Sequence, residues 1–332
     1  MSKLSVVICT YMRPESLERL LISIKEQTEY PEEILIIDGS TNTKTSKLLE
    51  NTAIENLTYY LVPPEHRGLT RQRNYGVERV SSSIDIISFL DDDTVLQENY
   101  IKNLKKGFEE LPDAIGIGGV AINENRWKKN EANYKSSTST YILEGYYIKE
   151  SLRNKVRNVL KLSSPYPPSV MPPYSHGRTY MYPLTNKRYP VDLIVGMSMA
   201  FKKSIFEEIQ FSKYFEGYGL YEDADFSIRA GNFGQLYVDT NVQLEHFHAP
   251  SGRPNQYKYG KMVTRNGWFI WRTKFPKPSF KNILKWYAIS YVLIFIRFLN
   301  VITTKKRVEA FTESLGRVVG LFSLIFNKPK RI

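Results

Sequence analysis

Short apolar runs alternate with segments of helical periodicity over the first 125 residues. Leu4–Cys9 is an almost continuous apolar run, which is typical of a strand buried on both faces. Apolar residues within 17–24 then recur at the i, i+3, i+4, i+7 spacing of one helical face. Further strands are predicted at 34–37, 57–62, 84–90 and 115–122, and helices over about 68–80 and 96–111. This alternation predicts an α/β fold, a mostly parallel sheet flanked by helices.

The pattern changes between residues 126 and 190, a segment that holds nine Tyr and seven Pro. Only 149–162 has an amphipathic helical period there, so we expect an insertion made of one short helix and a Pro/Tyr-rich loop. Regular structure is expected to resume at 191. The predicted elements are a strand at 191–201, a helix at 222–230 and short strands at 235–238 and 242–247.

Positive charge is concentrated at the end of the chain. Residues 258–332 carry 16 Lys and Arg and two acidic residues, whereas the whole chain has a net charge of +12. The apolar stretches 286–302 and 315–326 are each interrupted by Arg, and a spanning helix needs about 20 mostly apolar residues. We therefore expect 256–332 to be a basic amphipathic helical tail on an anionic membrane surface. Helices that cap the domain and a true span remain alternatives.

Composition excludes several classes of protein. The single cysteine, Cys9, forms no internal disulfide, and one Cys with four His cannot build a four-ligand zinc cluster. A reducing compartment is therefore expected. The apolar run at the N-terminus lacks a cleavage site and is expected to be a strand, not a signal peptide. A nucleic-acid partner is not expected, because a nucleic-acid enzyme would spread basic residues over its binding face.

Polar residues follow the predicted strands at their carboxyl ends, where α/β sheets bind ligands. Thr10, Asp38 and the triplet Asp91, Asp92 and Asp93 all occupy such positions. Adjacent carboxylates repel one another unless water or a cation neutralises them. Oxygen ligands suit Mg²⁺ or Mn²⁺ shared with a phosphate, and a solvated acidic turn is the alternative.

Two further clusters contain groups able to do chemistry. Glu222 and Asp223 open a predicted helix, where one carboxylate can act as a general base or simply complement the helix dipole. His246 and His248 share one face of a predicted strand and are candidate metal ligands. Arg253 follows closely and is placed to meet a diphosphate.

These segments, taken in order, resemble family 2 glycosyltransferases with the GT-A fold over about residues 4–255. Residues 68–74 are similar to the family's Gly-x-x-x-Ala-Arg-Asn segment, with Gln72 in place of Ala. Residues 196–202 resemble its Gly-x-x-x-Ala-Phe-Arg segment, with Ser198 where Asn is common and Lys202 for Arg. The other matching segments are 6–14, 34–40, 89–93 with its Asp-x-Asp pattern, and 222–229 with its Glu-Asp-x-Asp helix.

The resemblance implies roles for the residues of both halves of the site. Asp93 would bind Mg²⁺ or Mn²⁺ at the donor diphosphate, with His246 or His248 completing the metal site. Asp223, beside Glu222, would deprotonate the acceptor hydroxyl. The implied contacts to the nucleotide-sugar donor come from Thr10, Arg13, Asp38 at the base, Arg73, Asp91 at the ribose or a metal-bound water, Asp92 and Arg253.

The resemblance also implies the organisation and activity of the chain. Residues 1–255 would form the catalytic domain, and the expected parts are a nucleotide-sugar half at 1–125, the insertion at 126–190 and an acceptor half at 191–255. We expect inverting transfer from a UDP or dTDP sugar to a hydroxyl of a glycan or lipid-linked acceptor. One base without a protein nucleophile favours this single displacement. The expected setting is cell-surface polysaccharide synthesis on the cytoplasmic, inner face of the plasma membrane.

Two alternatives to this activity remain. A nucleotide-sugar nucleotidyltransferase would usually open with a glycine-rich loop, whereas residues 10–14 contain no glycine. A catalytically dead, membrane-associated scaffold is the other alternative, although it would not need intact acids at 93 and 223.

Overall fold

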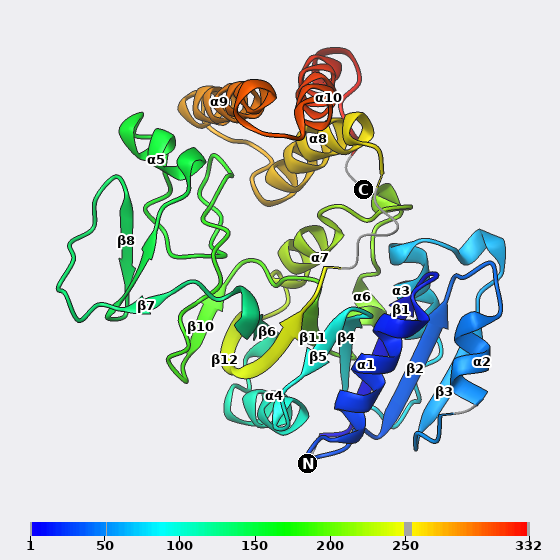
Figure 1. Ribbon diagram of the computed structural model, residues 1–332. Helices are drawn as coiled ribbons and strands as arrows, with labels where there is room; N and C mark the ends of the chain where they lie inside the picture. The colour runs from blue at the N-terminus through cyan, green and yellow to red at the C-terminus, as the bar shows by residue number, and fades with distance from the viewer. Residues whose placement is uncertain (1, 51, 249–253, 331–332) are drawn as a thin grey trace. The chain divides into compact units, whose positions relative to one another are not determined.

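The computed structural model describes residues 2–50, 52–248 and 254–330. The chain forms two compact units, each built from two segments (Figure 1). Unit 1 comprises Met1–Asn125 and Leu184–Gly252, and unit 2 comprises Arg126–Pro183 and Arg253–Ile332. The first segment of unit 2 begins at residue 126, like the predicted insertion, but it ends at Pro183 and not at residue 190. The second segment of unit 2 contains the helical tail.

Unit 1 is an α/β structure in which strands and helices alternate through residue 121, apart from two successive strands at Ile86–Asp91 and Thr94–Leu96. Pro14 opens the first helix, and the residues of its apolar face are buried. The elements up to residue 121 are β1 (Leu4–Thr10), α1 (Pro14–Lys25), β2 (Glu33–Asp38), α2 (Lys44–Glu50), β3 (Leu57–Leu61), α3 (Leu69–Val77), β4 (Ile86–Asp91), β5 (Thr94–Leu96), α4 (Tyr100–Glu110) and β6 (Ala114–Ala121). The later elements of unit 1 are β10 (Arg188–Val191), β11 (Ser198–Lys202), α6 (Ile205–Glu208), α7 (Glu222–Ala230) and β12 (Gln235–His246).

One large sheet runs through unit 1 in the order β10-β12-β6-β11-β4-β1-β2-β3, and β5 pairs with β12 beside this path. The expected α/β class is confirmed, but the expectation of a mostly parallel sheet needs a correction, because the sheet is mixed. Parallel pairing joins β1, β2, β3 and β4, and also β6 with β12. In contrast, β11 enters antiparallel between β4 and β6. The apolar pattern predicts which segments form strands, but it does not predict whether neighbouring strands run parallel or antiparallel.

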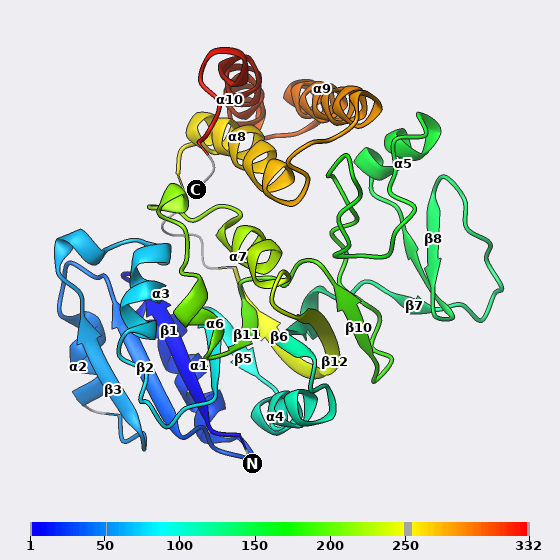
Figure 2. The ribbon, with the colours of Figure 1, turned by 180° about the vertical axis from the view of Figure 1, so that it is seen from behind.

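The register of the first strands brings polar residues to one edge of the sheet. Thr10 of β1 pairs with Asp38 of β2, and Cys9 pairs with Asp91 of β4. Since these strands are parallel, their carboxyl ends meet at the same edge. Helices α1 and α3 cover opposite faces of this part of the sheet, and neither covers that edge (Figures 1 and 2).

Four predicted elements of unit 1 differ from the observed ones. The strand predicted at 191–201 is two strands, β10 and β11, separated by a loop that contains Gly196. The helix predicted from residue 96 begins at Tyr100, because Thr94–Leu96 pairs with β12 as a short strand. The two strands predicted at 235–247 are one, β12, with a register shift between Val238 and Gln243.

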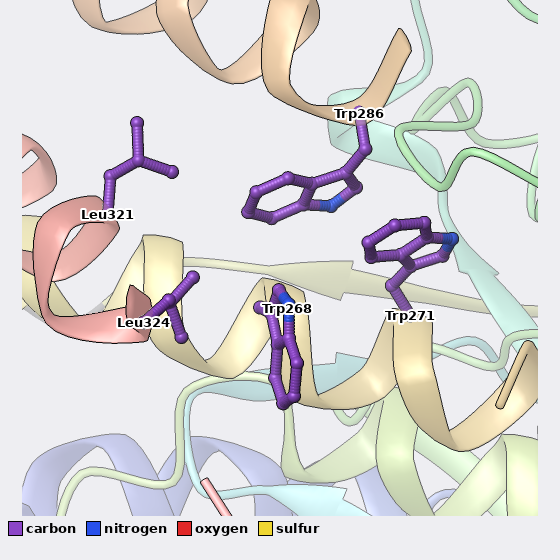
Figure 3. Packing of buried hydrophobic residues seen from close by; sticks show 5 residues of the cluster. All are labelled: Trp268, Trp271, Trp286, Leu321 and Leu324. Carbon is purple, nitrogen blue, oxygen red and sulfur yellow. The ribbon is translucent and has the colours of Figure 1, made fainter. Parts of the chain in front are cut away.

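Unit 2 combines a small sheet with helices. The sheet has the order β7-β9-β8, formed by β7 (Lys128–Lys129), β8 (Thr140–Leu143) and β9 (Tyr146–Lys149). Its helices are α5 (Leu152–Val159), α8 (Gln256–Lys274), α9 (Phe280–Thr303) and α10 (Arg307–Phe326). Trp271 and Trp286 stack with their ring planes 5° apart and join Trp268, Leu321 and Leu324 in a buried cluster (Figure 3).

The arginines that interrupt the apolar stretches of the tail are neutralised inside unit 2. The buried carboxylate of Glu313 accepts from Arg297 Nε at 2.7 Å and from Arg317 Nη2 at 2.6 Å. Helices α8 and α10 approach closely, since a Cβ on Gly260 would lie 2.1 Å from the Glu313 carbonyl oxygen. The tail is therefore a packed helical layer within its own unit.

Candidate active site

The acidic triplet lies at the turn between β4 and β5, and its members have different surroundings. Asp92 and Asp93 are buried, whereas the Asp91 side chain is 33% exposed. Thr10 Oγ1 donates to Asp92 Oδ2 at 2.7 Å, and Arg13 Nη1 lies 3.1 Å from Asp92 Oδ1. Burial raises the pKa of Asp92 to about 6, although Arg13 and Thr10 oppose this shift. Asp92 thus holds the turn against the end of β1.

Asp91 and Asp93 form a three-ligand group with His246. The candidate ligand atoms of these residues lie within 4.8 Å of one another, and His246 Nε2 is 3.3 Å from Asp93 Oδ1. His246 reaches this place because β12 pairs antiparallel with β5, opposite Thr94. Burial lowers the pKa of His246, but its hydrogen bond to Asp93 and the nearby carboxylates outweigh burial and raise it overall. Two carboxylates and an imidazole suit a divalent cation such as Mn²⁺.

Glu124 connects the two histidines on the side away from Asp93. Its Oε1 lies 3.1 Å from His246 Nδ1 and 2.6 Å from His248 Nε2. A carboxylate on the second nitrogen of a metal-ligating imidazole fixes the orientation of the ring. Among the described residues, the group with Asp91 and Asp93 includes His246 and not His248. The geometry therefore favours His246 over His248 as the candidate ligand.

Arg73 joins the triplet to the acidic start of α7. Its Nη1 pairs with Glu222, and its Nη2 lies 3.4 Å from Asp91 Oδ1. The guanidinium is 2% exposed and lies over the rings of Phe89 and Phe211, 5.8 and 5.4 Å from their centroids. Burial lowers the pKa of Arg73, but Glu222 and Asp91 outweigh it, so the pKa is raised overall and the group stays charged.

Glu222 and Asp223 are adjacent but differ in accessibility. Glu222 is buried and committed to Arg73, whereas Asp223 is half-buried. Asp223 Oδ2 accepts from the Gly196 backbone N–H at 2.9 Å, and Oδ1 accepts from the Ala224 N–H at 2.8 Å. The charge of Asp223 contributes to the raised pKa of Asp91, for which burial is the main cause. Asp223 is thus the accessible carboxylate of the pair and lies near the cation group.

Asp38 is fully buried, and both of its oxygens are used within unit 1. Oδ1 accepts from the Ser40 backbone N–H at 2.8 Å, and Oδ2 accepts from the Tyr59 hydroxyl at 3.0 Å. In this structure Asp38 therefore shapes the turn after β2. Arg253, the predicted diphosphate contact, lies outside the described residues.

Two residues of the site were missed by the sequence analysis in different ways. Glu124 follows β6, and the rule that ligand groups follow strand ends would have found it. Gly196 was noted only within a matching segment. Its carbonyl accepts from Arg73 Nη2 at 3.3 Å while its N–H donates to Asp223. A backbone contact of this kind leaves no chemical signature in a sequence.

Replacing Arg73 with Met should lower the free energy of unfolding by about 3–5 kcal/mol, because Glu222 is left buried without its partner. Arg71→Met is the matched control on the same helix. Its ion pair with Glu216 is solvent-accessible, with side chains 39% and 29% exposed, so a loss below about 1 kcal/mol is expected. Urea unfolding of both variants measures this difference. Equal losses of stability would show that the buried Arg73–Glu222 pair matters no more than the exposed Arg71–Glu216 pair.

Residues 5–167 match the family model described as Glycosyl transferase family 2. The chain is 28% identical over 122 residues to glucosyl-dolichyl phosphate glucuronosyltransferase of Haloferax volcanii, covering 36% of this chain and 38% of that protein. It is also 28% identical over 112 residues to GalNAc(5)-diNAcBac-PP-undecaprenol beta-1,3-glucosyltransferase of Campylobacter jejuni, covering 33% and 36%. The chain thus spans less than two thirds of the length of these curated relatives.

A solved structure similar in fold is the mannosyltransferase PcManGT from Pyrobaculum calidifontis, in complex with GDP-Man and Mn²⁺. The similarity covers 98% of this chain and 88% of that one, with a TM-score of 0.55 and 14% sequence identity, which shows a shared fold. The predicted resemblance to family 2 glycosyltransferases with the GT-A fold is therefore confirmed, and residues 5–167 carry the family match.

Proposed function

We propose that this protein is a metal-dependent, inverting glycosyltransferase that moves a sugar from a nucleotide-diphosphate donor to a hydroxyl of a glycan or lipid-linked acceptor. One observation carries the proposal. Asp91, Asp93 and His246 form a cation-sized group, and the accessible Asp223 lies near it in the same unit. Mn²⁺ accompanies GDP-Man in the structurally similar mannosyltransferase, which supports the same role for a cation here.

The donor half of the mechanism depends on charge. Asp91, Asp93 and His246 would hold Mn²⁺ or Mg²⁺, which supplies stabilisation of the leaving diphosphate when it is bound. Arg13 and Arg73 keep the triplet in place, since each lies against one or two of its carboxylates. Thr10 and Asp38 lie at neighbouring strand ends, where the nucleoside is expected to bind.

The acceptor half depends on one accessible carboxylate. Asp223 would take the proton of the acceptor hydroxyl, and its hydrogen bonds to two backbone N–H groups orient it for that task. Glu222 faces Arg73 instead and acts as a positioning residue. Asp223 as a single base on the acceptor side favours one displacement with inversion.

The tail supports the proposed location at a membrane surface. By length and composition α9 could cross a membrane. An 18-residue stretch of this helix has a mean hydropathy of 1.6, and 17% of that stretch is buried. Large apolar side chains of α9 and α10, among them Phe295 and Phe298, line a groove of about 470 Å³. Relatives whose names include dolichyl phosphate and undecaprenol support a lipid-linked acceptor.

Flotation of the full chain on anionic vesicles tests the location at a membrane surface, and a protein that stays in the dense fraction would contradict it.

Asp93→Ala should abolish cation-dependent donor binding, because it removes a carboxylate from the candidate cation group. Calorimetry with Mn²⁺ and the nucleotide sugar that binds the wild type measures the effect. Asp113→Ala is the control, since Asp113 is an exposed acid just before β6 in the same unit. An unchanged affinity of Asp93→Ala for the nucleotide sugar in the presence of Mn²⁺ would show that Asp93 is not a cation ligand.

Asp223→Asn should reduce the rate of transfer by about 10²–10⁴-fold while donor affinity is nearly kept, because the amide cannot accept the proton. Glu222→Gln is the comparison. If Glu222 only positions Arg73, its rate falls less than that of Asp223→Asn at saturating donor. Steady-state kinetics and donor calorimetry on both variants decide the assignment. Near-normal turnover by Asp223→Asn would exclude it as the base, and a wild type without turnover would favour the scaffold alternative.

A further inference from the structure

Basic side chains gather in unit 2 where α5, the loop after it and the start of α9 meet. Arg157 comes from α5, Arg178 from the loop and Lys285 from α9. Lys285 Nζ lies 3.8 Å from the centroid of the Tyr174 ring. Arg178 Cζ lies 4.0 Å from the centroid of the neighbouring Tyr141 ring. Burial raises the pKa of Tyr174, and the charges of Arg157 and Arg178 both oppose this shift.

No carboxylate neutralises this cluster. Within the described residues, Arg157, Arg178 and Lys285 form no ion pair. Glu150 is the acid whose charge reaches Arg157, but it is buried and its oxygens accept from Asn154, Asn158 and the Tyr180 hydroxyl. Among the described residues of unit 2, no carboxylate therefore balances the charge of Arg157, Arg178 and Lys285.

Several nitrogens of the cluster are buried and have no hydrogen-bond partner among the described residues. They are Arg157 Nε, Arg178 Nε, His176 Nε2 and Trp286 Nε1. Arg157 and Trp286 are more than nine-tenths buried. His176 connects them, because its carbonyl accepts from Arg157 Nη2 and its ring centroid is 6.0 Å from that of Trp286. Buried polar groups are rarely left unpaired, so this set indicates an acceptor from outside the chain.

The pKa values of the cluster also favour binding of an anion. Burial, together with Arg153 and Arg178, lowers the pKa of Arg157 to about 10. The pKa of Lys285 is lowered by burial and then by Lys281 and Arg157. Burial and two nearby arginines lower the pKa of His176 to about 3, so its ring is neutral at pH 7. An anion would relieve this like-charge repulsion.

We propose that Arg157, Arg178 and Lys285 bind a phosphate group carried on a membrane lipid. Guanidinium groups match phosphate geometry with paired N–H donors, and a lysine adds a point charge. The lipid source follows from α9, which carries Lys285 near its start and exposed apolar side chains farther along. At 1.5 Å per residue, Phe295 lies about 15 Å along the axis from Lys285. The helix α9 therefore offers a basic residue for the phosphate head and apolar side chains for the lipid chain.

The lipid source rests on the membrane location proposed above, whereas the phosphate site does not. The test therefore uses two probes on the full-length chain. One is flotation on phosphatidylcholine vesicles that contain phosphatidic acid or, at equal surface charge, a fatty-acid carboxylate. The other is calorimetry with inorganic pyrophosphate in solution.

The test variant is Arg178→Gln/Lys285→Gln, which leaves the buried Arg157 in place. The matched control is Arg126→Gln/Lys305→Gln, which removes the same two charges from exposed positions of unit 2. We expect the wild type and the control to prefer phosphatidic acid over carboxylate. The test variant should lose that preference and about tenfold or more in affinity, with an unchanged unfolding midpoint.

Equal losses in the two double variants, or a wild type that does not distinguish phosphate from carboxylate, would overturn the site. Pyrophosphate bound as tightly as phosphatidic acid vesicles would overturn the lipid source. A wild type that floats on no vesicle would contradict the membrane location alone. In that case, pyrophosphate binding lost only in the test variant would still support the phosphate site, and no binding by the wild type would reject it.

Discussion

The buried guanidinium of Arg73 is the constraint on which the candidate active site depends. It joins the end of β4, the start of α7 and the loop before β11 through Asp91, Glu222 and the Gly196 carbonyl. A charge with so little solvent is tolerated only when its partners are in place. Asp91 belongs to the candidate cation group, and Gly196, whose carbonyl Arg73 also binds, donates its N–H to Asp223. Arg73 therefore connects the two halves of the site.

Charge balance also explains why three adjacent acids in the sequence are not equivalent in the structure. Asp91 faces Arg73, Asp92 is held by Thr10 and Arg13, and Asp93 meets His246. Arg13 also lies 3.7 Å from Asp93, so the two arginines together reach all three carboxylates, which limits the repulsion that a solvated turn would relieve with water. Asp92 consequently holds the turn, while Asp91 and Asp93 lie with His246 in the candidate cation group.

Much of unit 1 was predictable, because apolar runs and helical periods are local and strand ends follow from them. The acids of the triplet and of α7 were found in this way. His246 was harder to assign, because its neighbours depend on the pairing of β12 with β5, which are about 150 residues apart. In unit 2, Arg297 and Arg317 seemed to interrupt apolar stretches, whereas Glu313 neutralises both across two helices. Such tertiary pairing has no local signature.

The central claim is that a nucleotide-sugar site in unit 1 is completed by a divalent cation. The most direct measurement is a thermal-shift screen of the wild-type chain with UDP, dTDP and GDP sugars, each with and without Mn²⁺ or Mg²⁺. A ligand that binds only the native state raises its stability by mass action. The account predicts a rise in unfolding temperature with one nucleotide, and only when the cation is present. A rise that is the same without the cation, or none with any donor, would contradict it.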